Sequence, residues 1–149
     1  MGKETNDLWL CPSGCPKTKF KLKEFANRDG LACVHRRVVI ALNAVRKDLC
    51  DRYNVEVEVI ITSATRTESD NERLAGTLGW ADEGGAVARN SKHLTRYGGI
   101  AVDLTARVKG TKSHVPQRIL GQLCRRHFDW VKDDYPDGHV HADMRTTGI

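Results

Sequence analysis

Apolar positions along this chain change period from one segment to the next, and the periods predict helices and strands. From Val34 to about Tyr53 apolar residues recur every three or four positions, which predicts a helix buried along one stripe. The stripe consists of Val38, Leu42, Val45 and Leu49. Directly afterwards, apolar and polar residues alternate from Val55 to Ile61, the period of a strand with one buried face.

The second half of the chain predicts another strand, another helix and a hairpin. Small and bulky residues alternate from Gly99 to Leu104, so Gly99, Ala101 and Asp103 share one face of a strand. A second helix is expected from Pro116 to Phe128, with Ser113 as its candidate cap. Pro136-Asp137-Gly138 is typical of a turn, which predicts a closing β-hairpin. Residues 65–73 are expected to be a loop entering a short helix, and residues 76–85 a loop.

These elements predict an α+β fold, in which a small antiparallel sheet packs against two main helices. Residues 1–19 contain Pro, Gly and Lys and are expected to form an irregular arm, whereas residues 20–149 form a single domain. No apolar run approaches the roughly 20 residues of a membrane span, and the N-terminus lacks the basic-then-apolar pattern of a secretory signal. We therefore expect synthesis in a cytoplasm without a signal peptide, and no membrane partner.

The cysteines and the net charge of +5 leave two questions open. Cys50 and Cys124 lie on apolar helix faces and are expected to be reduced core residues. Cys11, Cys15 and Cys33 remain unassigned; with His35 they could form a small N-terminal metal knuckle. The positive charge is compatible with any polyanion, including nucleic acid and the bacterial cell wall.

Histidines and carboxylates concentrate in segments that the two later strands bring together. His139, His141 and Asp143 alternate along the last strand and so share one face. His93 and Asp103 lie earlier in the chain, and Asp103 is in the strand expected from Gly99 to Leu104. Pairing of these strands would gather His93, Asp103 and His141 at one point. Two neutral imidazoles and one carboxylate suit a catalytic zinc ion, because they leave a fourth position for a water whose pKa can fall to about 7.

The order of several motifs resembles the zinc D-alanyl-D-alanine carboxypeptidase family, in particular the small single-domain peptidases of phage endolysins. The resemblance covers roughly residues 20–145. Its motifs are Phe20-Lys-Leu-Lys-Glu-Phe25, Ile61-Thr-Ser-Ala-Thr-Arg-Thr67, Asn90-Ser-Lys-His93, Gly99-Ile-Ala-Val-Asp-Leu104, Tyr135-Pro and His139-Val-His-Ala-Asp-Met-Arg145. That family shares its core with the hedgehog signalling domain and with lysostaphin-type enzymes. The resemblance implies a peptidase that hydrolyses a peptidoglycan stem peptide, at a bond of the L-alanyl-D-glutamate or D-Ala-D-Ala type.

Carried over by position, the resemblance implies one zinc ion per chain, held by His93, Asp103 and His141. It also implies that Arg66 binds the substrate carbonyl and stabilises its oxyanion. Ser91 is expected to support the loop that carries His93 and to help bind substrate.

The chain departs from the family pattern in two places. Nine residues separate His93 from Asp103, where the family usually has six, so the ligands meet only if the extra residues 94–98 loop out. Gly138 stands where the carboxypeptidases place the acid that acts as general base. His139, or alternatively Asp137 from the turn, is expected to take that role. Asp143 is expected to orient a ligand or Arg145.

Three functions are therefore open. The first is a monomeric zinc peptidase that acts on the bacterial cell wall. The second is a non-catalytic zinc domain of the same fold that binds a wall or virion, which the missing acid favours. The third, a nucleic-acid-binding protein, rests only on the net charge and the arginine pairs at 36–37 and 125–126, which lack interleaved aromatic residues. We expect no nucleic-acid partner.

Overall fold

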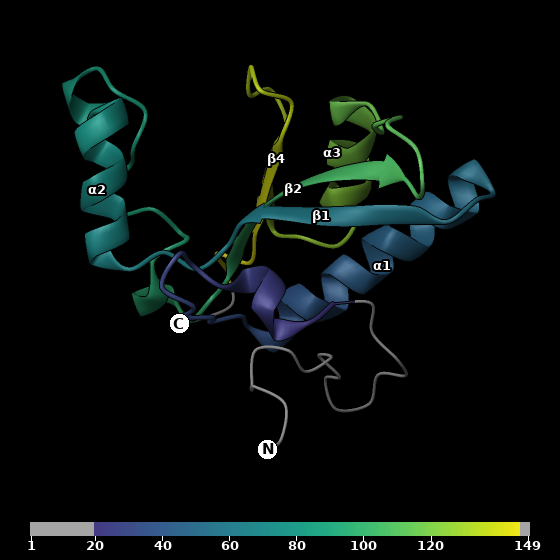
Figure 1. Cartoon of the computed structure of the whole chain (residues 1–149), viewed down its shortest axis with the longest axis horizontal. Helices are drawn as coiled ribbons and strands as arrows, with labels where there is room; N and C mark the ends of the chain where they lie inside the picture. Colours follow the sequence, from purple (N-terminus) through teal and green to yellow (C-terminus); the bar gives the residue numbers. More distant parts are fainter. Residues whose placement is uncertain (1–19, 147–149) are drawn as a thin grey trace.

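A computed structural model of the chain describes residues 20–146, so the arm predicted for residues 1–19 lies outside the described residues. Its elements follow one another along the chain as shown in Figure 1. They are η2 (Leu22–Phe25), α1 (Arg36–Tyr53), β1 (Val57–Ser63), α2 (Glu68–Leu78), η3 (Ala81–Glu83), η4 (Thr95–Tyr97), β2 (Ala101–Val108), α3 (Gln117–Arg125), β3 (Trp130–Lys132) and β4 (Val140–Asp143).

The four strands form one antiparallel sheet in the order β1-β2-β4-β3, which confirms the predicted α+β fold and its closing hairpin. Pairing aligns Ser63 of β1, Asp103 of β2, His141 of β4 and Lys132 of β3 in one row across the sheet. The register between β1 and β2 shifts after Ile61, where the ladder is irregular. Residues from all four strands therefore meet near the end of β1.

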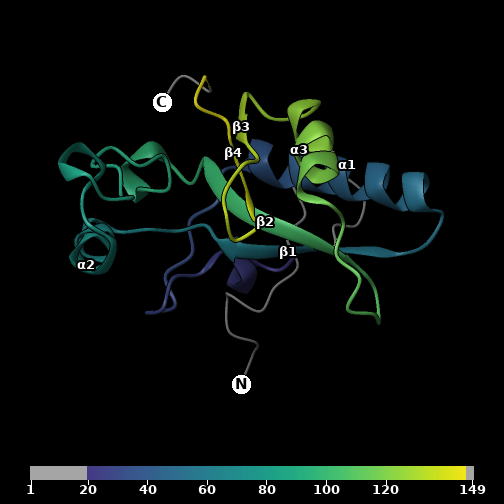
Figure 2. The same cartoon turned by 90° about the horizontal axis from the view of Figure 1, so that it is seen from above.

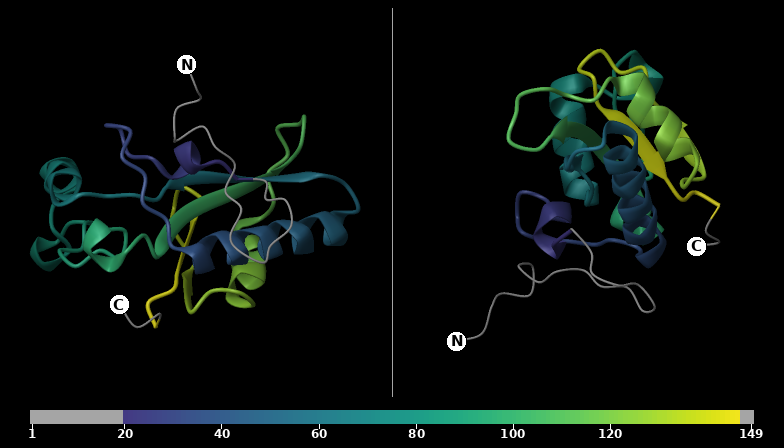
Figure 3. Two further views of the ribbon diagram at one scale, coloured as in Figure 1. Left: turned by 90° about the horizontal axis from the view of Figure 1, so that it is seen from below. Right: turned by 90° about the vertical axis from the view of Figure 1, so that its right-hand side faces the viewer.

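Helices α1 and α3 pack beside each other against one face of the sheet, as Figures 2 and 3 show from three directions. The predicted stripe of α1 is confirmed, because all four of its residues are fully buried; they are Val38, Leu42, Val45 and Leu49. Apolar side chains of β2 and β4 complete this core, namely Val102, Leu104, Val140 and Ala142. Because strand side chains alternate, Asp103 and His141 lie on the opposite face of the sheet.

Local details differ from the sequence expectations in three places. The predicted loop at residues 76–85 is wrong in its first part, because α2 continues through Gly76 to Leu78 and ends at Gly79, whose N–H bonds to the carbonyl of Ala75. Ser113 does not cap α3; its carbonyl accepts from the N–H of Val108, and α3 starts behind Pro116 without a side-chain cap. Strand β1 begins two residues after Val55, which is 49% exposed.

Helix α2 and the loop that follows it extend away from the sheet and the two packed helices (Figure 1). We call residues 68–90 the α2 arm. Within residues 20–146, no helix combines the length and the hydrophobicity that a membrane span requires.

Candidate metal centre

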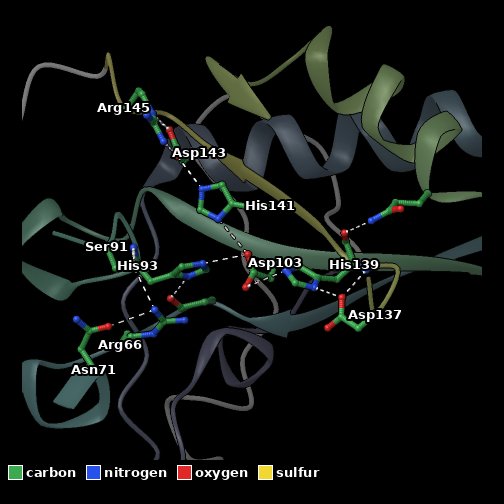
Figure 4. A network of polar contacts seen from close by, with 12 residues as sticks. Arg66, Asn71, Ser91, His93, Asp103, Asp137, His139, His141, Asp143 and Arg145 are labelled. Carbon is green, nitrogen blue, oxygen red and sulfur yellow. Dashed lines mark hydrogen bonds and ion pairs between the residues drawn. The ribbon is translucent and has the colours of Figure 1, made fainter. Parts of the chain in front are cut away.

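Two strands and one loop bring His93, Asp103 and His141 together, as the sequence predicts (Figure 4). Asp103 lies in β2, His141 lies opposite it in β4, and His93 lies in the loop before η4. One ligand atom from each residue falls within 4.8 Å of the other two, so this group could hold a metal ion. The two histidines are buried, and the Asp103 side chain is 14% exposed.

Both imidazoles point at the same carboxylate oxygen. Nε2 of His93 and Nδ1 of His141 each lie 3.0 Å from Oδ1 of Asp103. Burial acts to raise the pKa of Asp103, but the hydrogen bonds from His141 and His93 outweigh it and hold the pKa well below its usual range. Asp103 is therefore a carboxylate, and three donor atoms converge on one point.

The other nitrogen of each imidazole has a fixed partner, which fits the residues to a metal. Nδ1 of His93 donates to the carbonyl of Ala64 over 2.8 Å, and Nε2 of His141 donates to Oδ2 of Asp143 over 2.8 Å. Such outer partners fix the tautomer and the orientation of histidines that bind metals. The nitrogens that face Asp103, Nε2 of His93 and Nδ1 of His141, are therefore the ones that would bind a metal ion in their unprotonated form. Together with Asp103 they form a set of two nitrogens and one oxygen that suits zinc.

Asp143 is itself held in place, as the sequence predicts. It is fully buried, and Arg145 donates to both of its oxygens over 3.0 and 2.8 Å. Burial opposes ionisation, but hydrogen bonds from His141 and Arg145 lower the pKa of Asp143 to about 2. The guanidinium of Arg145 also lies 4.0 Å from the ring centre of Trp130, which packs edge-on to His141. A chain of contacts therefore runs from the surface to the ligand His141.

The long spacing between His93 and Asp103 is absorbed locally. Residues 95–97 form the 3-10 turn η4, and Gly98 and Gly99 follow with φ of 83° and 75°. Gly99 packs on the backbone of Cys33, where an added Cβ would lie 2.5 Å from the carbonyl oxygen, so no other residue fits there without a shift. The extra residues thus loop out, and the ligands meet.

Arg66 follows β1 and lies beside His93. The N–H of Arg66 bonds to the carbonyl of His93, and its Nη1 donates to Oδ1 of Asn71 and to Oγ of Ser91 over 3.3 and 3.1 Å. Ser91 also accepts from the N–H of His93 over 3.3 Å, which places it as the sequence predicts, in support of the His93 loop. Burial lowers the pKa of Arg66, although Asp103 and Asp70 oppose the shift. Asn71 is buried and was not predicted; no sequence signal separates it from other polar helix residues.

His139 and Asp137 form a pair at the rim of the site. Nδ1 of His139 donates to Oδ1 of Asp137 over 2.5 Å, while Nε2 of His139 faces Oδ2 of Asp103 at 3.7 Å. The Asp137 side chain is 71% exposed and lies behind the imidazole, away from the cleft. Backbone and side-chain hydrogen bonds from His139 lower the pKa of Asp137, so it stays a carboxylate. The geometry gives these two candidates different positions: His139 faces the metal group, and Asp137 holds His139.

Two residues without a predicted role hold the turn that carries His139. Nε2 of Gln117, at the start of α3, donates to the carbonyls of Tyr135 and His139 over 3.0 and 2.8 Å. The Tyr135 ring stacks on His139 at 4.0 Å with an angle of 18°. Tyr135 belongs to the Tyr-Pro motif and could have been found by it, whereas Gln117 carries no sequence signal.

The site lies in a cleft of about 520 Å³. Its walls include Arg66, Leu74, Leu78, Ser91, Trp130, Tyr135, His139 and Arg145. A second hollow of the same volume runs along β1 beside Phe20 and Glu24, and no histidine lines it. Within residues 20–146, the histidines and the carboxylate that could bind a metal therefore lie in the cleft beside β2 and β4.

The remaining cysteines and histidines have structural contacts. His35 caps α1 by accepting from the N–H of Arg37, and His127 pairs with Asp48. Cys124 is buried, which raises the pKa of its thiol to about 12, and Cys50 is partly buried. The proposed knuckle of Cys11, Cys15 and Cys33 involves two residues outside the described part of the chain.

Comparisons of the chain with protein-family models and with curated proteins found no match. The resemblance to zinc carboxypeptidases therefore stays a prediction, based on the motifs and on the residues that the fold brings together.

Proposed function

We propose that this protein is a zinc-dependent peptidase that hydrolyses an amide bond in peptidoglycan stem peptides. The observation that carries the proposal is the His93–Asp103–His141 group, in which a separate partner orients each imidazole. Arg66 and His139 line the same cleft. The cleft thus combines a candidate metal site, a cation and a base, which are the groups that metal-assisted amide hydrolysis requires.

His93, Asp103 and His141 would hold the zinc ion. When bound, zinc supplies a Lewis acid that polarises a carbonyl and lowers the pKa of a water to about 7. Imidazole and carboxylate ligands leave such a site a net charge of about +1. One zinc ion per chain is expected.

His139 is the proposed general base. Its Nδ1–H is engaged by the Asp137 carboxylate, so Nε2 carries the free lone pair and faces the metal group. This nitrogen can accept a proton from the attacking water and then donate it to the leaving amine. Asp137 orients the imidazole and stabilises its protonated form. In this role it would replace the acid that the carboxypeptidases have at the position of Gly138.

Arg66 is proposed to bind the substrate carbonyl oxygen. Its hydrogen-bond partners Asn71 and Ser91 are neutral, so its positive charge remains available to the oxygen that becomes negative in the transition state. These two partners fix the guanidinium beside His93. Ser91 therefore acts on substrate through Arg66.

The arrangement of the paired arginines argues against a nucleic-acid partner. In the pairs 36–37 and 125–126, Arg37 forms an ion pair with Asp129, Arg125 with Asp133 and Arg126 with Asp48. Those arginines are spread over α1 and α3 and do not form one stripe.

The experiment that tests the proposal is digestion of purified sacculi, with mass analysis of the fragments. We expect about one zinc ion per chain, released fragments with new amino termini, and loss of both zinc and release in His93→Ala and Asp103→Ala. His114→Ala is the matched control, because His114 is exposed and lies outside the cleft. Wild-type protein that releases no fragments would reject the proposal.

A non-catalytic zinc domain that binds the cell wall is the second candidate. It is favoured by Gly138, which occupies the place of the family's acid with φ of 88°. In the same experiment this function predicts zinc and sedimentation with sacculi but no new amino termini.

A further inference from the structure

The inner side of the α2 arm is apolar, although this helix contributes little to the core. Its only buried residues are Asn71 and Ala75. Leu74 and Leu78, four positions apart, share a helix face and line the cleft; Leu78 is 50% exposed. Ala86, Val87 and Ala88 of the following loop extend this wall. Exposed leucines in a cleft beside polar groups are typical of a ligand-binding surface.

The wall is held in place by its own contacts. Nδ2 of Asn71 donates to the carbonyl of Ala88 over 3.0 Å, which ties the loop to the helix. A bridge pairs Trp80 with Val87, and the guanidinium of Arg89 lies 4.4 Å from the ring centre of Trp80. These contacts therefore hold the apolar wall in a fixed position. The wall and the metal group line the same cleft.

The rest of the cleft indicates what kind of molecule it accepts. Arg66, Lys92 and Arg145 line it, whereas Asp103 is the one carboxylate among its lining residues, and Asp103 belongs to the metal group. A bound metal ion would add further positive charge. The cleft thus complements an acidic ligand that also carries an apolar group.

We propose that Leu74 and Leu78 form a subsite for an aliphatic side chain of an acidic peptide substrate. The proposal rests on the proposed peptidase function, and it assigns the α2 arm to substrate selection and the sheet to catalysis. Burial of one methyl group is worth about fourfold in kcat/KM. The subsite therefore predicts a preference for alanine over glycine in the peptide.

The test compares two synthetic peptides, an acidic stem peptide and its analogue in which glycine replaces each alanine. The variants are the double variant Leu74→Ala/Leu78→Ala and the control Leu31→Ala. Leu31 is 49% exposed and lies outside the cleft, so the control makes the same chemical change at nearly the same exposure. Both kcat/KM and the Kd from NMR titration are measured for each peptide, with the full chain loaded with zinc.

We expect the wild type and Leu31→Ala to prefer the alanine peptide at least about fourfold, and the double variant less than about twofold. A preference that survives in the double variant, or one absent in the wild type, would overturn the subsite. The titrations separate this failure from that of the peptidase. If the Kd values show a preference for the alanine peptide that depends on the two leucines, but neither peptide is cleaved, the subsite is supported and the peptidase is rejected. If the peptides are cleaved without a preference for alanine, the peptidase is supported and the subsite is rejected.

Discussion

Asp103 and His141 lie directly opposite each other on adjacent antiparallel strands, with Oδ1 of Asp103 3.0 Å from Nδ1 of His141. A shift of one residue between β2 and β4 would turn these side chains to opposite faces of the sheet. The metal group thus depends on strand register, and His93 is the one member that a loop supplies.

Zinc is expected to stabilise the folded chain. At a zinc concentration 100 times its Kd, binding adds about 2.7 kcal/mol to the free energy of unfolding, which raises the Tm by about 5–10 °C. Thermal unfolding with zinc and with a chelator measures the shift. His114→Ala keeps it and His93→Ala loses it; an equal shift in both variants would contradict the assignment of the ligands.

Asp143→Asn is expected to lower the affinity for zinc about 10- to 100-fold, because the neutral amide holds the His141 ring less well. Competition with a chelating dye measures the affinity. Asp134→Asn, on an exposed aspartate outside the cleft, serves as the control. Unchanged affinity in a folded Asp143→Asn protein would show that the partner of His141 does not matter for binding.

His139→Ala is expected to lower kcat by about 10²- to 10⁴-fold and to leave the zinc content unchanged, since His139 is the proposed base and not a ligand. Asp137→Asn keeps the imidazole and costs less. The rates at which the two variants digest sacculi show which substitution lowers kcat more. A larger loss in Asp137→Asn than in His139→Ala would transfer the role of base to Asp137.

Gln117→Glu removes the two donors that hold the turn before β4 without changing the size of the side chain. We expect kcat to fall about 10- to 100-fold because His139 loses its fixed position. NMR relaxation of the amides of Asp137 and His139 reports the loosening. Gln122→Glu makes the same change at an exposed site on α3, and a comparable loss there would indicate a general charge effect.

Asp70 makes stability depend on acid pH. Burial acts to raise its pKa, but hydrogen bonds from Thr67, Asn27 and Arg73 lower it from 3.8 to about 2. Because the folded pKa lies below the unfolded one, the stabilisation is present above pH 4 and is lost as the pH falls to 2; with solvent screening it amounts to about 1 kcal/mol. Urea unfolding of the wild type and Asp70→Asn measures the difference in stability at pH 6 and at pH 2.5. The difference in stability should shrink at the lower pH. Asp29→Asn makes the same chemical change at an exposed aspartate and serves as the control.

The sequence predicts those parts of the molecule that depend on local periodicity. The buried stripe of α1 and the faces of β2 and β4 follow from spacing alone, and the faces place Asp103 and His141 together once the strands pair. The role of Gln117 depends on where α3 lies relative to the closing turn, which periodicity does not encode. The length of α2 was missed because Gly76 is a poor helix former, yet it lies in open space and is tolerated before the Gly79 cap.

The α2 arm has a consequence for how such a protein can diversify. Its leucines face the cleft and add almost nothing to the core, whereas the ligands are fixed by the sheet. Substitutions of Leu74 and Leu78 can therefore accumulate without loss of the fold or of the metal group. Descendants of this chain could acquire new ligands by changing these two leucines, while the His93–Asp103–His141 group is inherited intact.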